Sequence, residues 1–281
     1  MQTNYSLHKI NHPDVFSFNP AHYSRFKFGD DVIAEDFGIA LANGFIEKHL
    51  KTHPIENQVV VISSPYAFIP TATFAMKNYF IYTLNIWLVE NNFPVVQEAK
   101  VYRTVTYKED YGALNAEERM KLISNDSFHI DSAFIKNKTL IFLDDIKITG
   151  SHEKLINKMI NEYSLCNDTY FLYYAELVNK SIHPSIENEL NFYYVKSIFD
   201  LDTLINDSRF FINTRIVKYI LNAEKHMFAE FIQNQSTHFI HLLYNMALGN
   251  SYHLMEAYTT NLNFLKKLLT FTKIKHSEYG N

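Results

Sequence analysis

The sequence is poor in cysteine and has no long hydrophobic run, and each shortage excludes a class of protein. Cys166 is the only cysteine among 281 residues, which excludes an internal disulfide framework. The most apolar stretch, "NYFIYTLNIWLVENN", is interrupted by Asn and Thr and falls short of the roughly 18 apolar residues of a membrane span. The first residues, "MQTNYSLHKINHP", lack the basic start and apolar core of a secretory signal. We therefore expect a cytoplasmic protein without a membrane partner.

An excess of positive charge is absent as well. The chain has 26 Lys and Arg against 30 Asp and Glu, a formal net charge of −4, so we do not expect a nucleic-acid partner. Aromatic residues are abundant instead, with 19 Tyr and 23 Phe, and 47% of all residues are apolar. This composition is typical of a folded globular protein, and the length allows one domain with a sizeable appendage.

The first hundred residues alternate between helical and strand patterns. Residues 1–28 show no clean period and contain two prolines, which predicts an irregular N-terminal arm. Apolar residues then recur at every fourth position from Ile33 to Phe45, which predicts one buried face of a helix. Val59–Ile62 is a β-branched run typical of a buried strand. A long helix from about 70 to 91 and a second strand over 93–103 follow.

The alternation continues to about residue 205. We expect a mobile loop at 104–115, a short helix at 116–123, a strand at 139–143, a helix at 151–163 and two aromatic-rich strands, "DTYFLYYAELV" and "NFYYVKSI". This order predicts an α/β fold over 29–205, with a mainly parallel sheet flanked by helices on both faces. Residues 206–281 contain no proline and show helical spacing, which predicts an all-helical C-terminal subdomain packed against the sheet domain.

The stretch "LIFLDDIKITGSH" combines an apolar strand, an acidic pair and a loop that enters a helix. Ligands of open parallel sheets collect at the carboxyl ends of strands, where the next helix presents free backbone N–H groups. Gly150 lacks a side chain that would block close backbone approach, so amides from Ile148 to His152 are expected to bind an anion. Asp144 and Asp145 would repel a bare polyphosphate and need hydroxyl groups or a metal as partners. A phosphorylated sugar supplies both a phosphate and hydroxyl groups.

This stretch resembles the phosphoribosyl pyrophosphate motif of type I phosphoribosyltransferases. That motif is an apolar strand, two acidic residues, an apolar residue and a Thr-Gly-rich phosphate loop. The match includes Asp144, Asp145, Ile146 and Thr149–Ser151, and it departs at Ile148 and His152, where the family usually has hydroxyl residues. With the order of elements, the resemblance covers about residues 29–200 and leaves the C-terminal helices outside.

The resemblance implies a role for each part of the site. Asp144 and Asp145 would accept hydrogen bonds from the ribose hydroxyls and stabilise the positive charge that develops on the ring as pyrophosphate leaves. The residues implied to bind the 5-phosphate are Ile148, Thr149, Gly150, Ser151 and His152. The residues implied near the pyrophosphate are Ser63, Ser64, Pro65, Tyr66 and Arg103, and those in a flexible closing loop are Tyr107, Lys108, Tyr111 and Gly112. Mg²⁺ would arrive with the phosphoribosyl pyrophosphate, without a direct protein ligand.

Two function classes follow. The first is a phosphoribosyltransferase that moves phosphoribosyl to or from a nitrogenous base with release of pyrophosphate. The second is a non-catalytic sensor that binds phosphoribosyl pyrophosphate or a nucleotide and signals through the C-terminal helices. The retained aspartates and Thr149-Gly150 favour the enzyme, whereas Ile148, His152 and a "SSPYA" loop without a basic residue favour the sensor. The sequence does not identify the acceptor base, and it is compatible with a homodimer.

Several patterns also have plainer readings. Asp144 and Asp145 fit a solvated strand-to-helix turn without a ligand, because acidic residues are common at helix starts. His238 and His241 lie three residues apart without a nearby third ligand, so no zinc site is expected. The aromatic run Tyr170–Tyr174 has the chemistry to stack on a base, although alternating aromatics in a strand usually belong to the core.

We predict that Gly150→Val abolishes phosphate binding, because a β-branched side chain would obstruct the loop that presents the amides. Isothermal titration with phosphoribosyl pyrophosphate measures the effect. Unchanged affinity in the variant would contradict an anion site at this loop.

Overall fold

A computed structural model describes residues 2–53, 55–103 and 128–278, and within these ranges the side chains of residue 103 and of residues 271–278 are not described. The predicted flexible loop at 104–115 and the short helix at 116–123 lie outside the described residues. Within them, no helix is both long and apolar enough to cross a membrane.

The described part of the chain consists of a sheet with its helices, followed by a helical region. The strands are β1 (Gln2–Ile10), β2 (Val59–Ser63), β3 (Gln97–Glu98), β4 (Tyr102–Arg103), β5 (Phe128–His129), β6 (Thr139–Lys147) and β7 (Thr169–Leu177). The helices around the sheet are α1 (Pro20–Lys27), α2 (Asp31–Phe45) with a π-helical turn η1 (Ile46–Leu50), α3 (Ala72–Glu90), α5 (Ser132–Ile135), α6 (Ser151–Glu162) and α7 (Ile186–Asn191). The remaining helices are η3 (Ile198–Leu201), α8 (Asp202–Ile205), α9 (Thr214–Leu221), α10 (Lys225–Gln233), α11 (Thr237–Gly249), η4 (Tyr252–Leu254) and α12 (Glu256–Glu278).

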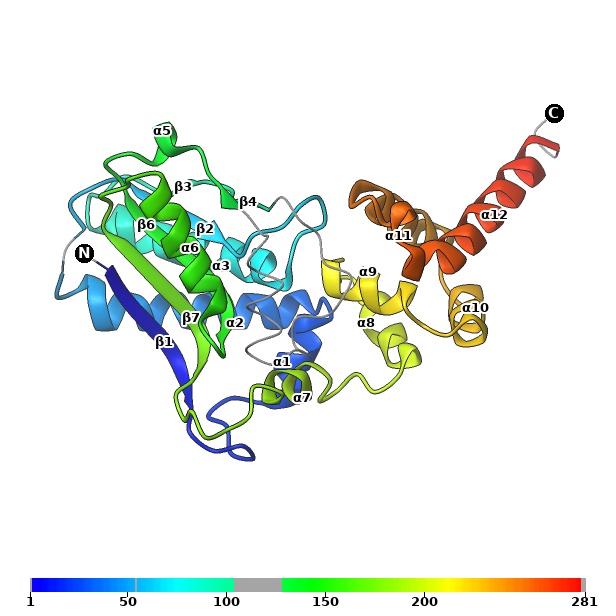
Figure 1. Cartoon of the computed structure of the whole chain (residues 1–281), viewed down its shortest axis with the longest axis horizontal. Helices are drawn as coiled ribbons and strands as arrows, with labels where there is room; N and C mark the ends of the chain where they lie inside the picture. The colour runs from blue at the N-terminus through cyan, green and yellow to red at the C-terminus, as the bar shows by residue number, and fades with distance from the viewer. Residues whose placement is uncertain (1, 54, 104–127, 279–281) are drawn as a thin grey trace.

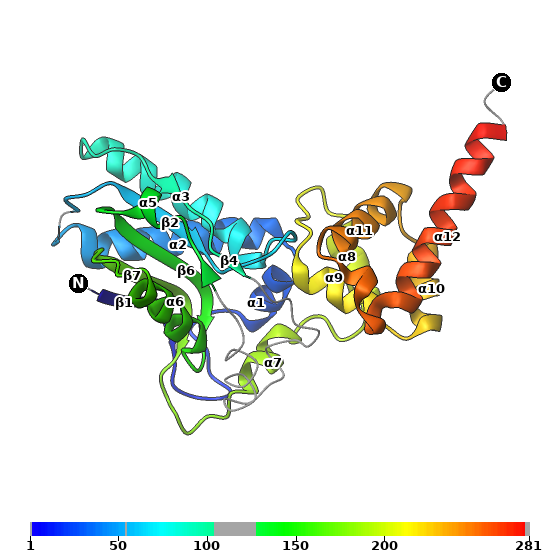
Figure 2. The same cartoon turned by 45° about the horizontal axis from the view of Figure 1, so that its top comes forward.

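The main sheet is parallel, which confirms the predicted α/β class. Among the described residues it has five strands in the order β1-β7-β6-β2-β3, with every neighbouring pair parallel. Figures 1 and 2 show α6 on one face of this sheet and α2 and α3 on the other. The short strands β4 and β5 form a separate antiparallel pair. Because all main strands run the same way, their carboxyl ends lie at one edge, where the acidic motif is also found.

Two predictions about the ends of the sheet domain were wrong. Residues 1–28 are not an irregular arm, because β1 pairs with β7 from Gln2 opposite Thr169 to Ile10 opposite Leu177, and α1 follows. An edge strand is half exposed, so its apolar pattern is weak. The stretch "NFYYVKSI" is not a strand, since α7 ends at Asn191 and η3 begins at Ile198. The edge strand beside β7 is β1 instead.

The predicted strand over 93–103 is also broken. Only Gln97–Glu98 joins the main sheet as β3, beside β2, and Tyr102–Arg103 turns away to pair with β5. The sheet therefore ends in a very short edge strand, and the chain leaves it at Ala99.

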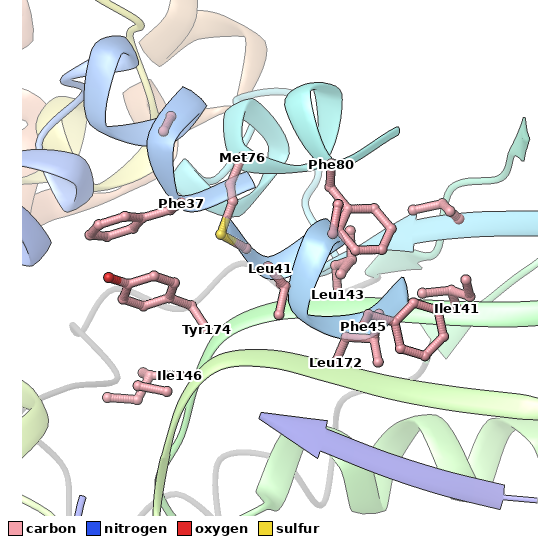
Figure 3. Packing of buried hydrophobic residues seen from close by; sticks show 14 of the residues in the cluster. Phe37, Leu41, Phe45, Met76, Phe80, Ile141, Leu143, Ile146, Leu172 and Tyr174 are labelled. Atoms are coloured by element: carbon pink, nitrogen blue, oxygen red, sulfur yellow. The ribbon is translucent and has the colours of Figure 1, made fainter. Parts of the chain in front are cut away.

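Buried side chains on the two faces of the sheet form separate clusters. The face toward α2 and α3 includes Ile141, Leu143 and Leu172, and the opposite face includes Leu140, Phe142 and Phe171. This division follows from the alternation of side chains along a strand. The predicted apolar face of α2 is confirmed, because its members are all buried: Ile33, Phe37, Leu41 and Phe45. Figure 3 shows three of them, with Met76 and Phe80 of α3, over the strands.

The C-terminal helices have a core of their own. The apolar residues that were expected to pack against the sheet domain, such as Phe228, Phe231 and Phe239, lie instead in a cluster made mainly by the helices from η3 to α12. We call η3 to α12 the helical unit. Its core also takes in Phe28 and Ile69 from the sheet domain. The boundary predicted at residue 205 stays a prediction, although Val195 already belongs to this core.

Candidate functional site

The acidic pair lies within β6 rather than after it. The strand was expected to end at Leu143 but continues to Lys147, with Asp144 opposite Tyr173 and Ile146 opposite Ala175 of β7. Successive side chains of a strand point to opposite faces. Asp144 and Asp145 therefore face different sides of the sheet and have different surroundings.

Asp145 points toward α1 and α3 and is buried, with 5% of its surface exposed. Its Oδ2 accepts a hydrogen bond from the Tyr23 hydroxyl at 2.5 Å and forms an ion pair with the Lys27 ammonium. Its Oδ1 accepts a hydrogen bond from Thr73 Oγ1 at 3.0 Å. A carboxylate with these three partners ties β6 to two helices.

The surroundings of Asp145 favour its charged form. Burial by itself would raise the pKa of Asp145, but the Lys27 ammonium and the hydrogen bonds from Lys27 and Tyr23 outweigh it and hold this pKa below its ordinary value. Burial and the nearby Asp145 carboxylate raise the pKa of Tyr23 well above its ordinary value, so the phenol stays a hydrogen-bond donor. The network is therefore an ionised carboxylate held by a cation and two hydroxyls.

Asp144 faces α6 and is half-buried. Its Oδ2 lies 3.1 Å from Nδ1 of His152 in the first turn of α6, and its Oδ1 accepts the backbone N–H of Asp145 at 3.0 Å. The structure thus brings together Asp144 and His152, two of the predicted site residues. Of the two aspartates, Asp144 is therefore the one whose carboxylate lies beside the predicted phosphate loop.

The loop that was predicted to bind phosphate has a left-handed glycine directly before a helix. Gly150 adopts the left-handed conformation, with φ of 70°, immediately before α6 begins at Ser151. Residues with a Cβ adopt this conformation only with strain. The Thr149 and Ser151 hydroxyl oxygens lie 2.7 Å apart. Ile148 packs against the core on the α2 side of the sheet, so its contribution to a ligand would come from its backbone.

The predicted pyrophosphate loop follows β2 at the same edge of the sheet. Ser63 ends β2 opposite Leu143 of β6, next to the acidic pair. Ser64 is buried, with its Oγ 3.4 Å from Thr71 Oγ1, and Tyr66 packs edge-on against Phe74. The four predicted residues, Ser63, Ser64, Pro65 and Tyr66, therefore connect β2 to α3 beside the phosphate loop.

Sequence reasoning missed the cation at this loop, which is Lys100. Its ammonium lies 4.0 Å from the centre of the Tyr66 ring and donates a hydrogen bond to the carbonyl oxygen of Ala67 at 2.7 Å. Burial lowers the pKa of Lys100 from its ordinary value. Lys100 comes two residues after β3, the strand beside β2, so parallel pairing places it near the loop. No sequence pattern pointed to Lys100, because the strand was predicted to continue to Arg103 and its end at Glu98 is seen only in the folded chain.

The remaining predicted residues, Arg103, the closing-loop residues and the tyrosines of β7, do not add side chains to this site in the described part of the chain. The backbone of Arg103 pairs with Phe128, and Tyr107, Lys108, Tyr111 and Gly112 lie outside the described residues. The aromatic residues considered for base stacking, Tyr170, Tyr173 and Tyr174, are buried in the core. No group of three or more His, Cys, Asp or Glu side chains in the described ranges is arranged to hold a metal ion. Asp144 could offer one carboxylate to a cation that a ligand brings.

A family model described as PRTase ComF-like matches residues 1–265. The chain belongs to this family. The match of the ComF-like phosphoribosyltransferase model includes β1 and the first part of α12, up to residue 265. The expectation that the family resemblance begins near residue 29 and leaves out the C-terminal helices was therefore wrong.

Solved phosphoribosyltransferase structures are also similar to this ComF-like chain. A hypoxanthine phosphoribosyltransferase from Staphylococcus aureus is 10% identical, with a TM-score of 0.33 over 51% of this chain and 74% of that one. One from Trypanosoma cruzi is 13% identical, with a TM-score of 0.35 over 54% and 77%. An adenine phosphoribosyltransferase is 17% identical, with a TM-score of 0.30 over 50% and 69%. No curated protein matches the chain. The family assignment rests on the family model.

We predict that Lys27→Met lowers the free energy of unfolding by about 3–5 kcal/mol at pH 7, because it leaves the Asp145 carboxylate buried without its cation. The folded-state pKa of Asp145 lies below its unfolded value of about 4. The ion pair therefore stabilises the wild type fully above about pH 4, and this stabilisation is lost as the pH falls through the folded pKa. In the variant, burial without a cation raises the pKa of Asp145, so this carboxylate is neutralised at a higher pH. The difference in the free energy of unfolding between the variant and the wild type should therefore become smaller as the pH falls. Urea unfolding at pH 7 and pH 4 measures both effects.

The control is Lys9→Met, which removes a lysine that is 49% exposed and pairs with Glu176 at 2.5 Å. An exposed ion pair contributes at most about 1 kcal/mol. Equal losses in the two variants would contradict a special role for the buried pair.

Proposed function

We propose that this chain is a phosphoribosyltransferase that binds phosphoribosyl pyrophosphate at the carboxyl edge of β2 and β6. The observation that carries the proposal is the left-handed Gly150 at the start of α6, with the Asp144 carboxylate beside the same turn. The backbone amides at the helix N-terminus suit the 5-phosphate, because they combine free N–H donors with the positive end of the helix dipole. Asp144 suits the ribose hydroxyls, which can donate hydrogen bonds to it.

The chemistry follows from the charge of these groups. The bond between C1 of the ribose and the pyrophosphate oxygen breaks, and its electron pair leaves with pyrophosphate. A nitrogen lone pair of the acceptor base then forms the new bond to C1, and the acceptor loses a proton. Positive charge develops on the ring between these events, and a fixed carboxylate at Asp144 stabilises that charge more in the transition state than in the ground state.

The pyrophosphate would lie against the loop that follows β2, where Lys100 supplies a positive charge. Its ammonium is held against Ala67 and Tyr66 of that loop, so it is near the group that becomes negative as the bond breaks. Mg²⁺ carried by the pyrophosphate would neutralise further charge, and Asp144 is the candidate carboxylate to contact it.

A second candidate function is a sensor that binds the same ligand without turnover. The observation that favours it is the complete engagement of Asp145 by Tyr23, Lys27 and Thr73. This network leaves one carboxylate of the pair to interact with the ribose. It also connects the motif strand to α1, which adjoins the helical unit through a hydrogen bond from Asn213 to the carbonyl oxygen of Lys27 at 3.2 Å.

The two aspartates should respond differently to substitution. We predict that Asp144→Asn lowers turnover on the order of 100-fold while binding of phosphoribosyl pyrophosphate is largely kept, because the amide retains the hydrogen bonds but not the charge. Asp145→Asn should lower the melting temperature instead, because it leaves Lys27 buried without a counter-charge. Pyrophosphate release, ligand binding and thermal unfolding are measured for wild type and both variants, with a panel of bases.

Each result favours one account. Wild-type release that Asp144→Asn loses supports the transferase, and wild-type binding with no release for any base supports the sensor. A wild type that neither binds nor releases pyrophosphate would sink both.

Lys100→Met should weaken binding of magnesium pyrophosphate by about 10- to 100-fold, the range expected for loss of one charged hydrogen bond. The matched control is Lys138→Met, because Lys138 also lies over an aromatic ring, 3.6 Å from the centre of Phe134, but precedes β6 at the opposite end of that strand. Isothermal titration measures both. Equal affinities in the two variants would contradict the assignment of pyrophosphate to the β2 loop.

A further inference from the structure

The helical unit holds the loop that connects β2 to α3. Asn250, at the end of α11, accepts two backbone N–H groups of this loop at its Oδ1, from Phe68 at 2.9 Å and from Ile69 at 3.0 Å. Asn250 is itself buried, and its amide nitrogen donates to the Tyr252 hydroxyl at 3.0 Å. One side chain of the helical unit therefore takes the place of a backbone partner for two consecutive loop residues.

Thr214, the first residue of α9, binds the next part of the same loop. Its hydroxyl is within hydrogen-bond distance of the carbonyl oxygens of Ile69 at 2.8 Å and Pro70 at 3.1 Å. Its backbone N–H donates to the carbonyl oxygen of Pro70 at 2.9 Å. The loop is thus bound through its N–H groups by Asn250 and through its carbonyl groups by Thr214.

Side-chain packing also holds two of these residues, Phe68 and Ile69. Ile69 is fully buried and belongs to the core of the helical unit, although it precedes that unit by more than a hundred residues. The ring of Phe68 lies so close to Gly249 that a Cβ there would be 2.1 Å from the ring. Glycine at this position is what permits the contact. The views in Figures 1 and 2 agree that the helical unit meets the sheet domain in the region of α9.

The segment fixed in this way, Phe68–Pro70, follows the candidate pyrophosphate residues in the loop between β2 and α3. β2 holds the beginning of the loop at Ser63, and the helical unit holds its end at Phe68–Pro70. The intervening Ser64–Ala67 is thus held at both ends, in addition to the contacts of Ser64 with Thr71 and of Ala67 with Lys100. A backbone that must present groups to an anion loses affinity when it is free to move, because binding must then order it.

We infer that the helical unit sets the conformation of the β2 loop, and that Asn250 and Thr214 are positioning residues for pyrophosphate binding. The inference rests on the proposed function in one respect, which is the ligand assigned to that loop. The helical unit would then be part of the binding machinery rather than an appendage.

Asn261 provides a matched control for Asn250. It is also a buried asparagine of the helical unit with two backbone hydrogen bonds, to the carbonyl oxygens of Leu221 at 3.0 Å and Ala223 at 2.8 Å. Both of its partners lie inside the helical unit. Asn250→Ala and Asn261→Ala should therefore destabilise the protein to a similar extent, and only Asn250→Ala should release the loop.

The test uses the full chain and three measurements. Hydrogen exchange reports the protection of the Phe68 and Ile69 amides without any ligand. Isothermal titration with magnesium pyrophosphate reports the affinity of the loop, and titration with ribose 5-phosphate reports the separate phosphate loop. For Asn250→Ala we expect exchange at Phe68 and Ile69 to rise and pyrophosphate affinity to fall at least about tenfold, with ribose 5-phosphate affinity within about twofold of wild type. At temperatures below its own melting temperature, Asn261→Ala should match wild type in all three measurements.

Thr214→Val keeps the shape and removes the hydroxyl, so it should give a smaller loss of the same kind if Asn250→Ala proves too unstable to measure. The inference is overturned if loop protection stays at the Asn261→Ala level, or if the loop is released without any loss of pyrophosphate affinity. A wild type that binds ribose 5-phosphate but not pyrophosphate would also overturn it. A wild type that binds neither probe overturns the proposed function, while the exchange result still decides whether the helical unit holds the loop.

Discussion

The ion pair between Asp145 of β6 and Lys27 of α1 is the interaction on which the arrangement of this molecule depends most. The carboxylate is buried at the carboxyl edge of the sheet, and its partners come from α1 and α3. Two charges out of water are stable only with good geometry and with their remaining hydrogen bonds satisfied. Tyr23 and Thr73 provide those hydrogen bonds, so the position of β6 relative to two helices is specified by one side chain. Lys27 also accepts a bond from Asn213 through its carbonyl oxygen, which brings the helical unit to the same place.

The alternation of side chains along β6 explains why two neighbouring aspartates have different environments. Asp145 faces the side of the sheet that α2 and α3 cover, where an unpaired charge would be costly. Asp144 faces α6, where it contacts His152 in the first helical turn and stays partly accessible. Extension of the strand by four residues beyond Leu143 is what produces this separation. A turn after Leu143 would have allowed both carboxylates to face one ligand.

The helical unit is coupled to the sheet domain by shared hydrogen bonds and by shared core residues. Phe28 and Ile69 lie in the core of the helices, and Arg209 forms an ion pair with Glu35 of α2 at 2.7 Å while its Nη2 donates to the Tyr79 hydroxyl of α3 at 2.9 Å. These contacts join segments far apart in the sequence, so they depend on both parts being in place. The family model spans both parts, in agreement with a single structural arrangement for the chain.

Local sequence determined the features that depend on near neighbours. The apolar face of α2, the strand that begins at Thr139, the helix that begins at Ser151 and the parallel α/β class follow from periodicity and from the order of elements, and the structure confirms them. Gly150 before α6 was predicted from its place between an acidic pair and a helix. The tertiary structure alone decided the rest, because it depends on residues that are distant in the chain. β1 was unreadable as a strand, since an edge strand acquires its identity from its partner β7. Three contacts join residues more than thirty positions apart. They are the buried ion pair of Asp145 with Lys27, the hydrogen bond of Lys100 to the β2 loop, and the hydrogen bonds of Asn250 to Phe68 and Ile69. No local period encodes such a pair, because only the folded backbone brings its members together.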